Sequence, residues 1–357
     1  MFPDRLLANN PNSYVIMPIK LFTKSFIFML SLVAISVVGW EYFLRSQGHQ
    51  LGYNDDEALW AKSRSEVYGS SDESTVFIGS SRIKFDLDIP TWEEKTGEKV
   101  VQLAMHGSCP LLALENLGED EKFKGKLVVD VTEGLFFKKR EDEAMSKRIK
   151  YLKDATPSEK VSAKIGMALE SVFLFIDKEK FSLGAYLDDL RIPDRKDVRG
   201  EGIFPKKFSY VNFQRQEIMT DEFVADTNMQ RQVTDLWSKW GALSDKPGIT
   251  GDTLEKIFNR VKSSVKKINE RGGKVVFVRT PSSGGYGLHE PVSYPRAQYF
   301  DKLMEVTGSP GIHFLDYADT KNFICPEWSH LSRPDAVKYT IALIKIMDDI
   351  QWFKTSK

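Results

Sequence analysis

The chain has 357 residues, of which 41% are hydrophobic and 28% charged, and its 50 basic residues balance its 50 acidic residues. A neutral balance provides no bulk positive charge for nucleic acid, so no nucleic-acid partner is expected. The 24 glycines, 15 prolines and 2 cysteines exclude collagen-like, disordered and disulfide-scaffold classes.

An apolar segment lies near the N-terminus. Sixteen uncharged residues, SFIFMLSLVAISVVGW, separate Lys24 from Glu41. Extended to Leu44, the segment has about 20 residues, which as a helix span the roughly 30 Å of a bilayer core. We therefore predict a transmembrane anchor over residues 25–44. A cleaved signal peptide and a buried core helix are the alternatives, but no small-x-small cleavage site follows the segment.

The charges that flank this segment predict its orientation. Lys20 and Lys24 precede it, whereas three acidic residues follow at 55–57. The positive-inside rule then places residues 1–24 in the cytoplasm. The rest of the chain would lie in the periplasm or at the outer face of the inner membrane, as the exported part of a single-pass membrane protein.

Five short apolar or β-branched runs follow, each with a turn and a potential helix after it. Because they are continuously apolar rather than alternating, they are typical of buried parallel strands. After a juxtamembrane linker over 45–73, this alternation predicts an α/β domain over 74–357. The expected architecture is a three-layer sandwich around a five-stranded, flavodoxin-like parallel sheet. The runs are Thr75–Gly79, Val100–Leu103, Leu127–Val131, Lys274–Val278 and Ile312–Leu315.

The third and fourth predicted strands are about 140 residues apart, which exceeds a normal crossover connection. The stretch between them includes a helical pattern near 158–176, the aromatic-rich sequence FPKKFSYVNF at 204–213, and Trp237 and Trp240. We predict a mostly helical cap inserted into the sheet domain at about 138–250.

Chemically useful side chains follow three of the predicted strands. Ser80 and Ser81 come after the first, His106 and Gly107 after the second, and Glu327 and His330 after the fifth. Ligands of open parallel sheets bind beyond the carboxyl ends of the strands, so these groups are expected near one another. A serine becomes a nucleophile only beside a base, which a histidine provides. A serine pair after a strand is also a common helix N-cap, so that interpretation stays open.

These sequences resemble the blocks of the SGNH (GDSL-type) hydrolases over residues 74–134 and 273–350. VFIGSSRIKF looks like the first block, with Ser80 replacing the usual Asp. Gly107 matches the glycine of the second block, and EWSHLS is similar to the D-x-x-H block. The resemblance implies Ser81 as nucleophile, His330 as base and Glu327 as the acid that orients it. The backbone N–H groups of Ser81 and Gly107 would form the oxyanion hole. Ser80 remains the alternative nucleophile.

Two positions depart from the family pattern. The acid is usually Asp rather than Glu, so Asp316 at the end of the fifth strand is the alternative to Glu327. The third block normally supplies an oxyanion-hole Asn, and Val131–Gly134 contains none. Either Thr132 substitutes for that Asn, or the hole is weaker, or catalysis is lost.

Two further histidines are candidate substrate-binding residues. His106 borders Gly107, and His289 follows the fourth strand in what we expect to be a flexible loop. His313 lies inside an apolar strand and is expected in the core. No metal-ligand spacing, P-loop or dinucleotide fingerprint is present, so no metal or cofactor is expected.

The two cysteines, Cys109 and Cys325, follow strands beside the candidate catalytic blocks. In an oxidising compartment they could form a bridge between the two loops, and two buried free thiols are the alternative.

The expected function is that of a membrane-anchored serine esterase or O-acyltransferase that acts on a cell-envelope glycan or a similar ester. The GSS variant, the anchor and the cap resemble cell-surface acyl-transfer proteins, including alginate O-acetylation proteins and the teichoic-acid D-alanylation accessory protein. That resemblance implies an acylated cell-envelope polymer as substrate and a polytopic membrane acyl-transfer protein as partner. The alternative is a catalytically inactive SGNH-like domain that serves such a complex as a glycan-binding or assembly partner.

Overall fold

The computed structural model describes residues 19–68, 74–138, 142–188 and 204–353, and the chain divides into two units, residues 1–49 and 50–357. The described part of the first unit is helix α1 (Ile19–Ser46), which contains the predicted anchor and extends beyond it at both ends. Its residues Leu21–Ser46 are long and apolar enough to span a bilayer.

The second unit is built around a five-stranded sheet in which every neighbouring pair is parallel. This part of the predicted fold class is confirmed. The strand order is β2-β1-β3-β6-β7, and the first three strands each begin one residue before the predicted run. The last strand is shorter than predicted, because residues 314–316 form a 3₁₀ turn. The strands are β1 (Ser74–Ile78), β2 (Lys99–Gln102), β3 (Lys126–Asp130), β6 (Lys274–Arg279) and β7 (Gly311–His313).

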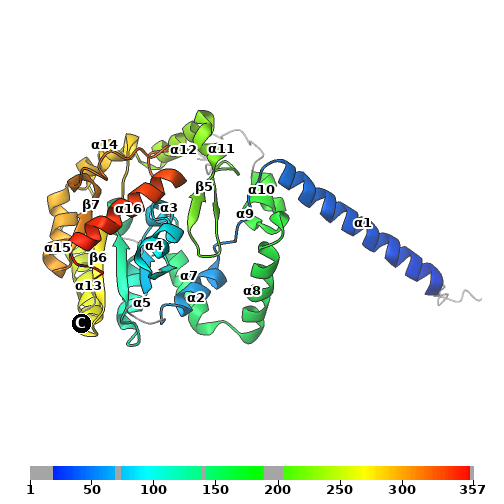
Figure 1. Cartoon of the computed structure of the whole chain (residues 1–357), viewed down its shortest axis with the longest axis horizontal. Helices are drawn as coiled ribbons and strands as arrows, with labels where there is room; N and C mark the ends of the chain where they lie inside the picture. Colours follow the sequence, from blue (N-terminus) through cyan, green and yellow to red (C-terminus); the bar gives the residue numbers. More distant parts are fainter. Residues whose placement is uncertain (1–18, 69–73, 139–141, 189–203, 354–357) are drawn as a thin grey trace, which may run out of the picture. The chain divides into compact units, whose positions relative to one another are not determined.

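Helices cover both faces of the sheet (Figure 1). Successive strand residues point to opposite faces, so Val76 and Ile78 join one apolar core and Phe77 joins the other. The first core includes residues of α2 (Glu57–Ser65), α5 (Leu111–Glu119), α13 (Gly251–Glu270) and α15 (Phe300–Thr307). The second includes residues of α3 (Ser81–Asp86), α4 (Ile89–Thr96) and α16 (Arg333–Asp349). The sheet is therefore the middle layer of three.

The segment between β3 and β6 holds most of the remaining elements. It is rich in helices, but the aromatic-rich stretch at 204–213 contains the first strand of an antiparallel hairpin. Its elements are α6 (Glu133–Phe136), α7 (Glu143–Asp154), α8 (Pro157–Glu170), a 3₁₀ turn (Leu174–Ile176), α9 (Lys178–Phe181), α10 (Leu183–Asp188), β4 (Ser209–Val211), β5 (Glu217–Met219), α11 (Asp221–Ala225) and α12 (Thr227–Trp240), followed by α13.

Two segments differ from their predicted conformation. The expected flexible loop after β6 is helix α14 (Gly284–Ser293), which a 3₁₀ turn (Arg296–Gln298) follows. The expected juxtamembrane linker over 45–73 contains α2, whose Trp60 is fully buried and donates from Nε1 to the Leu103 carbonyl at 3.1 Å. Burial of this large aromatic side chain attaches α2 to the sheet unit.

The two cysteines are buried free thiols. Cys109 belongs to one core and Cys325 to the core on the opposite face of the sheet, so the sheet separates them. Burial raises the pKa of the Cys109 thiol to about 11, which keeps it in the unreactive protonated form.

Truncation of Trp60 tests whether α2 belongs to the folded unit. We expect Trp60→Ala to lower the free energy of unfolding by about 3–5 kcal/mol, because it removes a large buried side chain and leaves the Leu103 carbonyl without its donor. Chemical denaturation of the detergent-solubilised chain measures this change. Trp240→Ala is the matched control, since Trp240 is 57% exposed. Equal, small losses in both variants would contradict the assignment of α2 to the core.

Candidate active site

The two serines after β1 have different partners. Gly79 brings the end of β1 against β3, where any Cβ would lie 2.4 Å from the Cβ of Asp130. Ser80 is the N-cap of α3, and its hydroxyl accepts a hydrogen bond from the Arg82 N–H at 3.2 Å. Ser81 is the first residue of α3, so its hydroxyl has no capping role. The N-cap interpretation therefore applies to Ser80.

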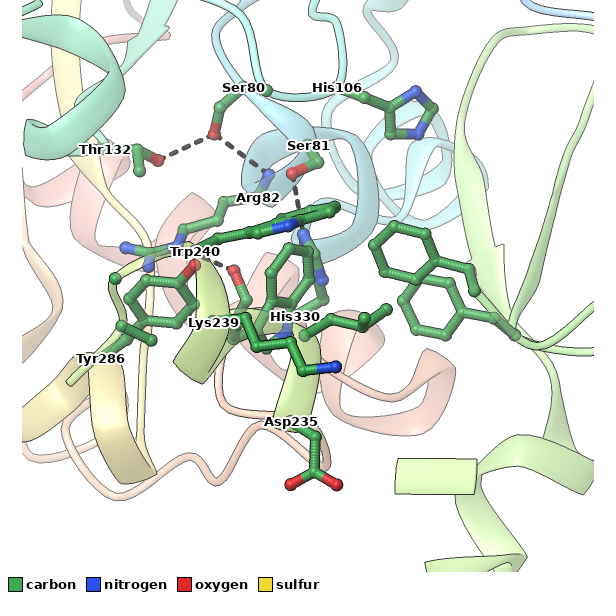
Figure 2. Close-up of a pocket in the computed structure, with 18 of the residues that line it drawn as sticks. Ser80, Ser81, Arg82, His106, Thr132, Asp235, Lys239, Trp240, Tyr286 and His330 are labelled. Atoms are coloured by element: carbon green, nitrogen blue, oxygen red, sulfur yellow. Dashed lines mark hydrogen bonds between the residues drawn. The ribbon is translucent and has the colours of Figure 1, made fainter. Parts of the chain in front are cut away.

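Ser81, His330 and Glu327 form a continuous hydrogen-bond chain. Ser81 Oγ lies 2.8 Å from His330 Nε2 (Figure 2), and His330 Nδ1 lies 2.9 Å from Glu327 Oε1. A carboxylate oxygen accepts only, so Nδ1 carries the proton in this contact and Nε2 is free to accept the Ser81 proton. His330 is 2% exposed and Glu327 is fully buried. The arrangement has the geometry of a nucleophile, a base and an orienting acid.

A tight turn brings Glu327 to His330. Trp328 has a φ of +78°, an uncommon left-handed conformation, and its N–H donates to the Cys325 carbonyl. The turn lets Glu327 Oε1 accept from the His330 backbone N–H at 2.6 Å as well as from its ring. The Trp328 indole occupies the space beside Gly284, where a Cβ would lie 2.1 Å from Trp328 Cδ1. The turn therefore requires glycine at position 284, because any side chain there would clash with the Trp328 indole.

Trp237 completes the environment of the acid. Its indole Nε1–H donates to Glu327 Oε2 at 2.5 Å, so both oxygens of the buried carboxylate have a donor. Trp237 comes from α12, 90 residues before Glu327. Phe85 of α3 also stacks on the His330 ring, with the centroids 4.3 Å apart. Sequence reasoning noted Trp237 only as an aromatic residue of the insertion, because no spacing pattern connects it to the acid.

Thr132 is not placed to donate to an oxyanion. Its hydroxyl and that of Ser80 each donate to Asp130 Oδ2, at 2.9 and 2.8 Å, and the two hydroxyls contact each other (Figure 2). A hydroxyl carries one proton, so neither group keeps a proton for a ligand. The substitution of Thr132 for the third-block Asn is therefore not supported. Asp130 itself is fully buried, and burial raises the pKa of its carboxyl.

The glycine of the second block lines the same cleft as Ser81. Gly107 has a φ of +56°, a conformation that favours glycine, and no atom lies within 4 Å of a built Cβ. His106, next to it, also lines the cleft and contacts the buried Glu217 carboxylate through Nε2. Glu217 Oε1 accepts from the Ser209 hydroxyl at 2.6 Å, and Lys84 Nζ lies 3.6 Å from Oε2.

In the part of the chain that the structure describes, the remaining candidate residues, Asp316, His289 and His313, make no hydrogen bond or ion pair with the Ser81–His330–Glu327 chain. Asp316 forms an exposed ion pair with Arg296 at 2.5 and 2.8 Å, so Glu327 and not Asp316 is the partner of His330. His289 lines the cleft from α14, and its Nδ1 lies 2.6 Å from Asp245 Oδ1. His313 is buried as expected, and burial together with the nearby Arg279 charge lowers its pKa to about 3.

A buried ion network supports the two loops that carry Ser81 and His330. Arg82, directly after Ser81, pairs with Glu290 of α14 at 2.6 Å, and its Nε donates to the Ser329 hydroxyl at 3.3 Å. Arg279 at the end of β6 pairs with the other Glu290 oxygen at 2.5 Å. Burial alone would raise the pKa of Glu290, but the charges of both arginines outweigh it and lower the pKa. The network joins the Ser81 loop to the His330 loop, and sequence reasoning did not identify it.

The site opens into a large cleft with a volume of about 2120 Å³. Its aromatic lining residues are Phe85, Phe204, Phe208, Trp237, Trp240, Tyr286 and Tyr294, and its basic ones include Lys180, Lys206, Arg231, Lys239 and Lys246. Such a lining can contact both the apolar faces and the charged or polar groups of a large ligand. Among the described residues, no group of three or more His, Cys, Asp or Glu side chains is placed to hold a metal ion.

A scan against protein-family models found no match for this chain, and a search of curated proteins found none either.

The charge cluster around the buried Glu217 predicts an acid-sensitive contribution to stability. Burial would raise the pKa of Glu217, but the charges of His106 and Lys84 outweigh it and lower the pKa to about 2 from 4.5. A lowered folded-state pKa stabilises the protein above the unfolded pKa, and that contribution is lost as the pH falls from about 4.5 to 2. The lowered pKa of Glu217 contributes about 3 kcal/mol to the free energy of unfolding above pH 4.5.

We therefore expect Glu217→Gln to flatten the fall in unfolding free energy between these pH values, as measured by denaturation at a series of pH values. Glu222→Gln, which removes a carboxylate from an exposed pair with Lys207, is the matched control and should keep the wild-type slope. An unchanged slope in Glu217→Gln would contradict the assigned environment.

Proposed function

We propose that this chain is a membrane-anchored, SGNH-like serine esterase or O-acyltransferase that acts on a cell-envelope glycan or a similar ester. The single observation that carries the proposal is the hydrogen-bond chain from Ser81 through His330 to Glu327. The segment at about 138–250 would act as a cap, because it contributes Trp237 to the acid and Trp240 to the cleft.

The geometry supports an acyl-enzyme mechanism. Ser81 Oγ attacks the ester carbonyl carbon while His330 Nε2 takes the hydroxyl proton. Glu327 keeps the opposite ring nitrogen protonated and stabilises the imidazolium that forms. The tetrahedral intermediate then collapses, the C–O bond to the leaving alcohol breaks, and His330 returns the proton to that alcohol. The acyl group remains on Ser81.

The second half of the reaction decides between hydrolysis and transfer. Water or a sugar hydroxyl attacks the acyl-enzyme with His330 again as base, which releases a free acid or forms a new ester. The cleft is wide enough to admit a glycan acceptor as well as a donor. Access of water to the acyl-enzyme therefore selects the outcome.

Backbone N–H groups would stabilise the oxyanion. Ser81 is the first residue of α3, where the N–H has no carbonyl partner within the helix. Gly107 borders the cleft in an unhindered conformation. With the Thr132 proton directed to Asp130, the hole has two donors, and loss of one donor costs about 3 kcal/mol in well-studied enzymes.

The anchor supports the proposed location. α1 would span the membrane once, with residues 1–24 in the cytoplasm and the sheet unit in the periplasm or at the outer face of the inner membrane. An acylated envelope polymer fits the aromatic and basic lining of the cleft, and a polytopic acyl-transfer protein in the same membrane would be the acyl source for a transferase.

One observation favours a second candidate function. The third oxyanion donor is absent because the Thr132 proton is directed to Asp130, which weakens the case for turnover. The alternative is an inactive SGNH-like domain that binds glycan in the cleft or assembles with a membrane acyl-transfer complex.

Paired serine variants test the proposed function. We expect Ser81→Ala to reduce turnover of an activated acetyl ester by about 10³-fold or more, because the nucleophile is lost. Ser80→Ala should keep turnover within about tenfold of the wild-type rate. The Ser80 hydroxyl caps α3, so its loss mainly lowers the stability of the protein. Steady-state ester hydrolysis by the purified chain provides the measurement. Equal rates in wild type and Ser81→Ala would exclude the enzyme and favour the binding or assembly role.

Trp237 gives a prediction specific to the cap. We expect Trp237→Phe to lower kcat/KM by about 10- to 100-fold, because it removes a hydrogen bond to a buried carboxylate that is worth about 1.5–3 kcal/mol. Trp240→Phe on the same helix is the matched control, since Trp240 also lines the cleft but is largely exposed. Its acylation rate at saturating substrate should stay close to wild type. Equal effects of the two variants would mean that Trp237 acts only through the shape of the cleft.

A further inference from the structure

Helix α8 carries three large apolar residues on the side away from the core. Val161, Ile165 and Leu169 are 56%, 57% and 43% exposed. The spacing i, i+4, i+8 places them within an arc of about 80° on the helix, and we call them the α8 stripe. The residues of α8 that approach the rest of the unit are less apolar. They are Ala163, Gly166 and Met167, which are half-buried, and Glu170, which is buried.

A short tether of chain and hydrogen bonds connects α8 to the end of the apolar helix α1. Asn54 Nδ2 donates to the buried Glu170 Oε1 at 2.6 Å, and Asn54 Oδ1 accepts from the Lys178 N–H at 3.0 Å. Both bonds attach Asn54 to the C-terminal end of α8 and the start of α9. Asn54 is eight residues after Ser46, the last residue of α1. A fully extended chain covers about 28 Å over that length, so Asn54, which is bonded to the end of α8, stays within that distance of the end of α1.

Charges beside the stripe suit a lipid surface. Lys160 and Lys164 are exposed on α8 next to Val161 and Ile165, and Lys150 and Lys153 are exposed on the preceding helix α7. Lysine stems lie along an apolar surface while their ammonium groups reach anionic headgroups. An apolar face flanked by lysines is the composition of helices that lie in a membrane interface.

We propose that the α8 stripe inserts into the interface of the same bilayer that α1 spans, as a second membrane contact. This inference rests on the membrane anchorage proposed above for α1. The occupant of the stripe is the lipid surface, because the short tether limits how far α8 moves from the membrane and the lysines complement its anionic headgroups.

The contact would also orient the cleft. Figure 1 shows α8, α9 and α10 along one edge of the sheet unit. Glu179 and Lys180 of α9 and Leu187 of α10 line the cleft. With α8 in the interface, this wall of the cleft faces the bilayer, from which an acyl donor or a lipid-linked substrate reaches Ser81.

Single spin labels on the full-length chain test the inference. The chain is reconstituted in vesicles of phosphatidylethanolamine and phosphatidylglycerol and labelled at Ile165→Cys, at Ser263→Cys as an exposed control on α13, or at Val33→Cys within α1. The native cysteines are 7% and 1% exposed, so the unsubstituted chain provides the labelling blank. Accessibility to oxygen is compared with accessibility to a water-soluble nickel chelate, which separates lipid from water.

We expect the Ile165 and Val33 labels to be accessible to oxygen but protected from nickel, and the Ser263 label to be accessible to nickel. A nickel-accessible Ile165 label beside a lipid-buried Val33 label would overturn the α8 contact and leave the anchor intact. Protection of the Ile165 label from both reagents would indicate a protein partner or a second copy, which also overturns it. A nickel-accessible Val33 label would overturn the anchor and the inference that rests on it.

Discussion

The buried carboxylate of Glu327 is the constraint on which the rest of the site depends. A fully buried charge costs several kcal/mol unless hydrogen bonds compensate it. Three donors do so here, namely the His330 backbone N–H, the His330 ring and the Trp237 indole. These three hydrogen bonds require the left-handed turn at Trp328 and helix α12, which lies between β3 and β6 in the sequence. Contacts of the Glu327 carboxylate therefore link the turn at Trp328 to helix α12.

The parallel sheet supplies the frame for this arrangement. Carboxyl ends of parallel strands meet at one edge, so the loops after β1 and β7 approach each other although 249 residues separate Ser81 from His330. The Arg82–Glu290–Arg279 network then fixes the two loops to α14. Because its charges are buried and mutually satisfied, loss of one partner would leave an uncompensated charge beside Ser81. The sheet topology thus brings the two loops together, and the buried ion pairs stabilise their positions.

The sequence was sufficient where local patterns decide the structure. Continuous apolar runs identified the five strands, and the residues after them identified Ser81, Glu327 and His330, which the fold brings together. Sequence patterns did not predict contacts that depend on the tertiary structure. Trp237 reaches Glu327 across 90 residues, and no spacing signals such a bond. Thr132 was a reasonable oxyanion donor by position, but the buried Asp130 takes its proton. Trp60 in the expected linker was a missed signal, since a tryptophan in a helix often marks a packed face.

A fluorophosphonate probe tests the central claim most directly, because it reacts only with a serine that a neighbouring base activates. Peptide mapping after labelling of the purified chain should place the adduct on Ser81, and the adduct should be lost in His330→Ala. An adduct on Ser80 would contradict the assignment of Ser80 as the cap of α3. No adduct on a chain shown to be folded would contradict an activated nucleophile altogether.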